Sequence, residues 1–217
     1  MDRFIDRRDA GARLAEALAP RVAAWPSPVV LGIPRGGVVV ADVVARTLEL
    51  ELDVLGVEKV GAPWNAELAV GAVGEGDALW IDPDLSPLVG AGVLRDTIER
   101  ERSELADKLA DVRAVRPRIS LTGRTALVVD DGIATGATVR AALLALESER
   151  PALRVLAVPV GPPDTLAALA AVADEVVCPL QPASFRAVGL WYEVFDQTPQ
   201  REVLRIFEER GTAAERP

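Results

Sequence analysis

Two adjacent acidic residues stand at the end of an apolar run in the second half of the chain. Asp130 and Asp131 follow Thr125–Val129, a run that is typical of a buried strand. Carboxylates at the carboxyl end of a strand can accept hydrogen bonds from the vicinal hydroxyls of a sugar, directly or through Mg²⁺ and its waters. The pair is therefore a candidate ligand and metal site.

A loop of small residues follows the two acids and leads into a predicted helix. Small residues let backbone N–H groups approach an anion, and the positive end of a following helix favours a phosphate. An Asp-Asp-Gly turn or a Thr helix cap alone is common without a ligand, so the prediction depends on the combination. The predicted phosphate loop consists of Ala134, Thr135, Gly136, Ala137 and Thr138.

A second glycine loop lies earlier in the chain. The apolar run Val29–Ile33 ends at Pro34-Arg35-Gly36-Gly37, and a pattern compatible with a helix follows. This loop is not a nucleotide P-loop, because Val38-Val39 stands where that motif requires Lys and then Ser or Thr. By itself it fits an ordinary turn between a strand and a helix. Together with the acidic segment downstream, it becomes a second candidate anion site.

The acidic segment resembles the signature of the type I phosphoribosyltransferase family, in which apolar residues precede two acids and a short Thr-Gly-Thr type loop. The resemblance implies that Asp130 and Asp131 face the ribose 2- and 3-hydroxyls of 5-phosphoribosyl-1-pyrophosphate, with Mg²⁺ bound directly or through water. It also implies that the loop from Ala134 to Thr138 holds the 5-phosphate. The resemblance covers roughly residues 28–192.

The same resemblance assigns a pyrophosphate site to the first glycine loop. Arg35, Gly36 and Gly37 are expected to bind pyrophosphate through backbone amides and the guanidinium group. Family members often supply a further Lys or Arg after the next strand, where this chain has Lys59, one of its two lysines. A solvated surface lysine is the alternative for Lys59.

The expected cover over the acceptor is an aromatic segment near the carboxyl end, here called the hood (about residues 180–200). Aromatic planes in the hood could stack a planar base, or they could pack the segment against the sheet. The candidate residues are Phe185, Val188, Trp191 and Tyr192.

Strands alternate with helices along the chain, which predicts an α/β fold with a parallel twisted sheet and helices on both faces. We expect a single domain over residues 1–217, with a flexible loop or hairpin excursion at about residues 61–92 that could close over the ligand. The predicted strands are Val29–Ile33, Leu52–Val57, Thr125–Val129, Arg154–Pro159 and Glu175–Cys178. The predicted helices are Asp9–Leu18, Val38–Leu48, Val93–Val112, Thr138–Glu147 and Thr165–Ala173.

Composition excludes several classes of protein. The chain has 217 residues, a formal net charge of −9, no histidine and one cysteine, Cys178. Catalysis by Ser-His-Asp or Cys-His arrangements is therefore excluded, and the negative charge argues against nucleic acid as a partner. Without an apolar run of about 20 residues or a leader pattern, we expect a cytoplasmic protein with no membrane association. The family resemblance implies a homodimer.

The predicted function is Mg²⁺-dependent transfer of the phosphoribosyl group to a nitrogenous base or similar small planar acceptor, with release of pyrophosphate. Family members that act on 6-oxopurines commonly have Asp at the position of Ala134, which argues against that acceptor class. The first alternative is a regulator that senses phosphoribosyl pyrophosphate or a nucleotide without reaction. A phosphoacceptor receiver domain is a weaker third reading, because at least two predicted strands precede the acidic pair and 86 residues follow it.

Overall fold

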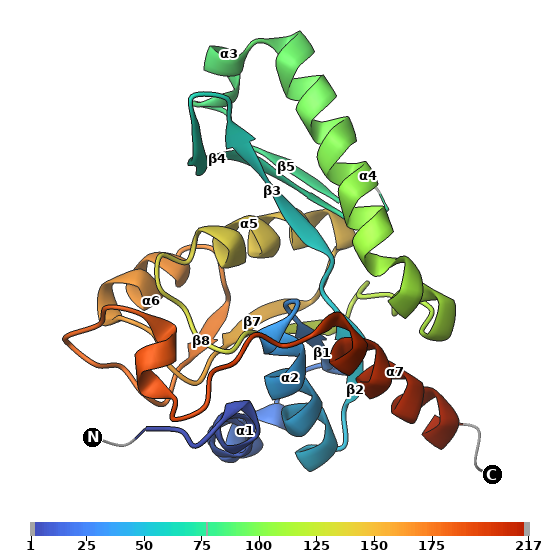
Figure 1. Ribbon diagram of the computed structural model, residues 1–217, viewed down its shortest axis with the longest axis vertical. Helices are drawn as coiled ribbons and strands as arrows, with labels where there is room; N and C mark the ends of the chain where they lie inside the picture. The colour runs from blue at the N-terminus through green and yellow to red at the C-terminus, as the bar shows by residue number, and fades with distance from the viewer. Residues whose placement is uncertain (1–2, 77, 215–217) are drawn as a thin grey trace.

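The computed structural model describes residues 3–76 and 78–214. A five-stranded parallel sheet in the order β2-β1-β6-β7-β8 forms the base of the molecule (Figure 1). The prediction of an α/β fold with a parallel sheet is confirmed. The strands are β1 (Val29–Gly32), β2 (Glu51–Val54), β6 (Thr125–Val129), β7 (Leu153–Ala157) and β8 (Glu175–Val177).

Helices cover both faces of this sheet, because alternate strand residues point into two different cores. Val30 and Leu127 enter one core, whereas Val29 and Val128 enter the other. The first core contains α1 (Arg7–Val22), α2 (Gly36–Thr47) and α7 (Gln200–Ala214), and the second contains α5 (Ala137–Ala145) and α6 (Pro163–Leu169). In the described part of the chain, no helix is both long and apolar enough to cross a bilayer.

The N-terminal helix is longer than the sequence pattern predicts. Asp6 caps it, since its carboxylate accepts hydrogen bonds from the backbone N–H groups of Arg8 and Asp9 at 2.8 and 2.9 Å. The helix therefore begins at Arg7, and it continues through Pro20 to Val22 instead of ending before the proline.

The chain leaves the parallel sheet after β2 and forms a projecting lobe, residues 57–115 (Figure 1). The predicted strand Leu52–Val57 is therefore divided between two sheets. The division falls at Gly56, where a Cβ atom would overlap Leu109. A three-stranded antiparallel sheet with two helices occupies most of the predicted excursion, so this segment is a hairpin structure. The lobe contains β3 (Val57–Ala62), β4 (Asn65–Gly74), β5 (Leu79–Ile81), α3 (Ser86–Val89) and α4 (Ala91–Val115).

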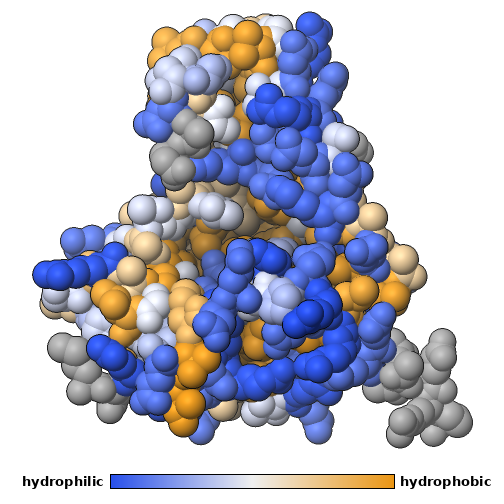
Figure 2. Space-filling model, viewed as in Figure 1, coloured by the Kyte–Doolittle hydropathy of each residue, from blue (hydrophilic) through white to orange (hydrophobic). Residues whose placement is uncertain are grey.

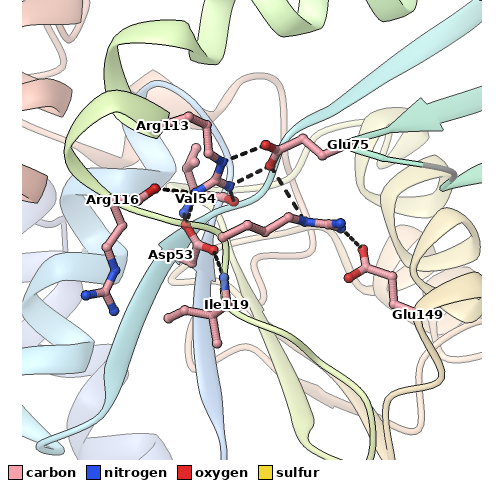
Figure 3. Close-up of polar contacts among 8 residues, drawn as sticks. Asp53, Val54, Glu75, Arg113, Arg116, Ile119 and Glu149 are labelled. Carbon is pink, nitrogen blue, oxygen red and sulfur yellow. Dashed lines mark hydrogen bonds and ion pairs between the residues drawn. The ribbon is translucent and has the colours of Figure 1, made fainter.

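Charged residues tie the lobe to the base, and we call them the junction cluster: Arg113, Asp53 and Glu75 (Figure 3). Arg113 of α4 donates to Asp53 at 2.7 Å and to both carboxylate oxygens of Glu75 at 2.5 and 2.6 Å. Asp53 lies in β2, is 2% exposed and also accepts a hydrogen bond from the backbone N–H of Ile119. Two sheets and the long helix α4 are thereby joined.

Cys178 lies just beyond β8, in the core beneath α5 and α6. Burial raises the pKa of its thiol to about 12. The thiol consequently stays protonated in neutral solution.

The remaining short elements are η1 (Leu146–Glu149), which extends α5, and η2 (Val188–Trp191), which lies in the hood. None of the predicted helices covers α7, although Val203, Ile206 and Phe207 are buried there at helical spacing.

Candidate functional site

The candidate site lies at the carboxyl edge of the parallel sheet, between β1 and β6. The chain passes from β1 to β2 on one side, whereas β6 pairs with β1 on the other side. Ligands of open α/β sheets bind at such a switch point, beyond the carboxyl ends of the strands. Gly32 and Val129 are paired in register, so the loops that follow the two strands begin level with each other.

These two loops touch, and glycine is needed at the contact. A Cβ atom on Gly37 would lie 2.8 Å from both the Cα atom of Asp130 and the carbonyl oxygen of Val129. A Cβ atom on Gly36 would overlap the carboxylate of Asp131. The structure thus brings the predicted pyrophosphate loop and the predicted acidic pair into one site.

The acidic pair is electrostatically strained. Burial raises the pKa of Asp130 well above its usual value, and the neighbouring charge of Asp131 raises it further. Burial also raises the pKa of Asp131, although the guanidinium of Arg7 opposes this shift. The backbone N–H of Asp131 donates to Oδ1 of Asp130 at 2.8 Å and only partly offsets the effect. A cation bound at the pair would relieve the repulsion.

Arg7 was not predicted from the sequence to belong to the site. Its Nε donates to Oδ2 of Asp131 at 2.7 Å, and both side chains are at most 15% exposed. The same guanidinium donates to the carbonyl oxygen of Asp196 and lies 4.1 Å from the centroid of the Phe195 ring. We call Arg7, Asp130 and Asp131 the site cluster. The first turn of α1 therefore connects the acidic pair to the hood.

The two carboxylates are suited to Mg²⁺ as one part of a shared coordination shell. Magnesium in proteins is commonly held by one or two carboxylates, waters and the phosphates of the substrate. Among residues 3–76 and 78–214, no group of three or more His, Cys, Asp or Glu side chains could hold a metal ion. Asp130 and Asp131 could accordingly hold Mg²⁺ when a phosphorylated ligand supplies the other oxygens.

The predicted phosphate loop opens α5. Gly136 has φ of 72°, a left-handed conformation that favours glycine, and the helix begins at Ala137. Thr135 and Thr138 are exposed, and the hydroxyl of Thr165 donates to the carbonyl oxygen of Ala134 at 3.0 Å. The backbone N–H groups of the first helical turn and two threonine hydroxyls are thus the donors that this loop could offer to an anion.

The aromatic residues of the hood contact one another and the acidic loop. Phe185 and Trp191 are stacked, with ring centroids 6.4 Å apart. The hydroxyl of Tyr192 donates to the backbone carbonyl of Asp131, and its ring packs against Phe4 and Phe195. Tyr192 is only 4% exposed, so its ring is packed inside the hood while its hydroxyl supports the acidic loop.

Val188 brings the hood against the turn after the acidic pair. A Cβ atom on Gly132 would lie 2.5 Å from Cγ1 of Val188. Gly132 has φ of 156°, at the margin of the region that side chains avoid. The hood therefore adjoins the site on the side of β7 and β8, where the isolated bridge between Val160 and Leu180 lies.

Lys59 and Arg35 line different cavities. Lys59 lies in β3 and lines a cavity of about 570 Å³ with Arg100 and Glu101 of α4. Arg35 follows a cis peptide bond from Pro34 and lines a cavity of about 460 Å³ between the base and the lobe. Thr138 of the phosphate loop lines this second cavity too.

Comparisons with known proteins agree on one family. A family model described as a phosphoribosyl transferase domain matches residues 6–190. The crystal structure of TT1426 from Thermus thermophilus superposes with a TM-score of 0.88 and 48% identity, over 95% of this chain and 98% of that chain.

Two curated relatives, from two strains of Mycobacterium tuberculosis, carry phosphoribosyl transferase as a provisional name. Each is 46% identical over 212 residues, which is 96% of this chain and 47% of the relative. The chain thus spans about half the length of these relatives.

Proposed function

Because this chain belongs to the phosphoribosyl transferase domain family, as the resemblance indicated, we propose that it is a phosphoribosyltransferase. It transfers the 5-phosphoribosyl group from 5-phosphoribosyl-1-pyrophosphate to a nitrogenous base or similar acceptor and releases pyrophosphate. The contact between the loop of Gly36 and Gly37 and the acidic pair carries this proposal. A sugar diol, a 5-phosphate and a pyrophosphate need three adjoining sites, and the loops that follow β1 and β6 meet at one sheet edge.

Each part of the donor has a proposed partner. The carboxylates of Asp130 and Asp131 accept hydrogen bonds from the ribose hydroxyls. The phosphate loop, which ends at Thr138, binds the 5-phosphate through backbone N–H groups and hydroxyls. The guanidinium of Arg35 and the backbone amides of Gly36 and Gly37 bind the pyrophosphate.

The reaction breaks the bond between C1 of the ribose and the pyrophosphate oxygen, which keeps the bonding electrons, and a nitrogen of the acceptor forms the new bond to C1. The protein need not supply a nucleophile, because the acceptor attacks a sugar with cationic character. Arg35 and the amide groups beside it stabilise the negative charge that develops on pyrophosphate. Bound Mg²⁺ supplies further stabilisation of that charge.

Calorimetric titration with phosphoribosyl pyrophosphate, with and without Mg²⁺, tests the site. We expect Mg²⁺-dependent binding that an Asp130→Asn, Asp131→Asn variant weakens by about 100-fold or more, roughly 2.8 kcal/mol. A matched Asp107→Asn, Asp111→Asn variant removes two exposed acids of α4 and should bind as the wild type does. Equal binding by both variants, or no binding by the folded wild type, would contradict the proposal.

A measurement of turnover distinguishes a phosphoribosyltransferase from a sensor that binds the donor without reaction. We expect pyrophosphate release when purine and pyrimidine bases are added one at a time to the protein with phosphoribosyl pyrophosphate and Mg²⁺. Tight donor binding without release for any base would instead favour a regulator that senses phosphoribosyl pyrophosphate.

A further inference from the structure

The cavity between the base and the lobe extends from the candidate site to α4. Its walls include Arg35 and Thr138 from the two loops of the site, and Glu58 and Lys108 from the lobe. Figure 2 shows the narrow lobe standing on the broad base, with apolar surface between them. The cavity is therefore continuous with two predicted phosphate-binding elements.

Lys108 contributes a positive charge to this cavity. Its side chain is 55% exposed, and its Nζ lies 2.8 Å from Oε1 of Glu58. The hydrogen bond with Glu58 raises the pKa of Lys108, so the ammonium group keeps its charge in neutral solution. A lysine side chain has a flexible stem and three donors, which lets it bind an incoming anion while it remains near Glu58.

Apolar side chains on the walls of the cavity would exclude water from a bound anion. Leu105, Leu109 and Val112 of α4 line the cavity, together with Val203 of α7. Charges act more strongly where aliphatic groups displace water, because the local dielectric constant is lower. The charged side chains that line the cavity are Arg35, Lys108 and Glu58, which sum to one positive charge and favour an anion. Glu104 lies 4.0 Å from Nζ of Lys108 but does not line the cavity.

We propose that Lys108, from the lobe helix α4, completes the pyrophosphate-binding site that Arg35 begins. This inference rests on the function proposed above. It assigns to Lys108 the pyrophosphate-binding role that the family resemblance implied for Lys59. The donor then bridges the base and the lobe, with the ribose and 5-phosphate on the base and the pyrophosphate held from both sides.

The two lysines of the chain provide a matched test. The probe is inorganic pyrophosphate with Mg²⁺, titrated into the full chain by calorimetry. We expect Lys108→Met to weaken binding at least tenfold, because methionine keeps much of the aliphatic stem but has no charge. Lys59→Met should change binding less than twofold, and Lys108→Arg should retain most of the wild-type affinity. Equal affinity in wild type and Lys108→Met, or the larger loss in Lys59→Met, would overturn the assignment.

Ribose 5-phosphate serves as the control ligand, because it occupies the base without reaching the pyrophosphate site. We expect Lys108→Met to bind it as tightly as the wild type does. A similar loss for this ligand would mean that the substitution damages the whole site, and the assignment would fall.

The same titrations distinguish this inference from the proposed function. If the wild type binds phosphoribosyl pyrophosphate and Lys108→Met binds it equally well, only the assignment of Lys108 fails. If the wild type binds no phosphoribosyl pyrophosphate, the proposed function fails and the assignment fails with it.

Discussion

The junction cluster and the site cluster have the same composition, two carboxylates and one arginine, but opposite degrees of pairing. In the junction cluster, Arg113 donates to both Asp53 and Glu75. In the site cluster, Arg7 donates to Asp131, and Asp130 accepts a backbone N–H. Because both carboxylates of the junction cluster are paired with Arg113, the cluster holds the lobe against the base. At the site the carboxylate of Asp130 lies outside the ion pair of Arg7 and Asp131, which suits a place where a ligand or cation completes the cluster.

Removing the arginine of the junction cluster should have the largest effect on stability. We expect Arg113→Met to lower the free energy of unfolding by about 3–5 kcal/mol, because the buried carboxylate of Asp53 would lose the guanidinium that neutralises it, and Glu75 would keep the more distant Arg118 at 4.0 Å. Urea denaturation measures this loss. Arg100→Met on the same helix is the control, since Arg100 is 60% exposed and its ion pairs should be worth at most about 1 kcal/mol.

A double variant checks the cause of that loss. Adding Asp53→Asn to Arg113→Met removes one uncompensated charge and should restore part of the stability. If Arg113→Met costs no more than Arg100→Met, the junction cluster does not stabilise the lobe.

Removing the arginine of the site cluster should act mainly on ligand binding. Arg7 opposes the rise in the pKa of Asp131, so Arg7→Met should raise that pKa further. The carboxylate must lose its proton to bind Mg²⁺, and we therefore expect Mg²⁺-dependent donor binding to fall about tenfold near pH 7, roughly 1.4 kcal/mol. Binding should recover as the pH rises.

Titrations from pH 6 to pH 9 measure this shift. Arg8→Met is the control, because Arg8 is half-exposed and pairs with Glu202 at 3.6 Å. An unchanged pH profile in Arg7→Met would show that Arg7 does not tune the acidic pair.

Neutralising Asp130 should have the smallest effect on the free energy of unfolding, and it should raise this free energy instead of lowering it. Because its pKa is raised in the folded protein, the folded state binds more protons than the unfolded state above the usual value of 3.8. Wild-type stability is therefore lost as the pH rises from that value toward the raised pKa. Asp130→Asn removes this loss.

We expect the ligand-free Asp130→Asn variant to be about 0.5–2 kcal/mol more stable than wild type at pH 8. The difference should shrink toward pH 4. Urea denaturation at both pH values measures this difference. Lower stability of the variant at pH 8 would contradict the inference that an ionised Asp130 destabilises the folded protein.

The sequence predicted the parts of the site that are contiguous in the chain. A buried strand, two acids, a loop of small residues and a helix start lie within Ala126–Thr138, so their local pattern was sufficient. The alternation of strand and helix patterns along the chain likewise predicted the parallel sheet. The roles of Asp130 and Asp131 in ligand binding stay predictions until the titrations are made.

Contacts between distant residues left no comparable pattern. Arg7 and Asp131 are 124 positions apart, and Arg113 and Asp53 are 60 apart. In an arginine-rich chain, nothing local separates these two arginines from solvated ones. The division of the predicted strand Leu52–Val57 at Gly56 could not be predicted for a similar reason. The close approach of Leu109 of α4 to Gly56 is a contact between residues that are distant in the sequence.

Because Cys178 is buried, a second cysteine introduced into the lobe could be labelled selectively. With its pKa near 12, the native thiol should react slowly with maleimides in neutral solution, so it need not be replaced. Trp64, in the turn between β3 and β4, is 57% exposed. A cysteine placed there would be the single readily alkylated thiol of the chain, and a fluorophore on it would report the position of the lobe as the donor binds.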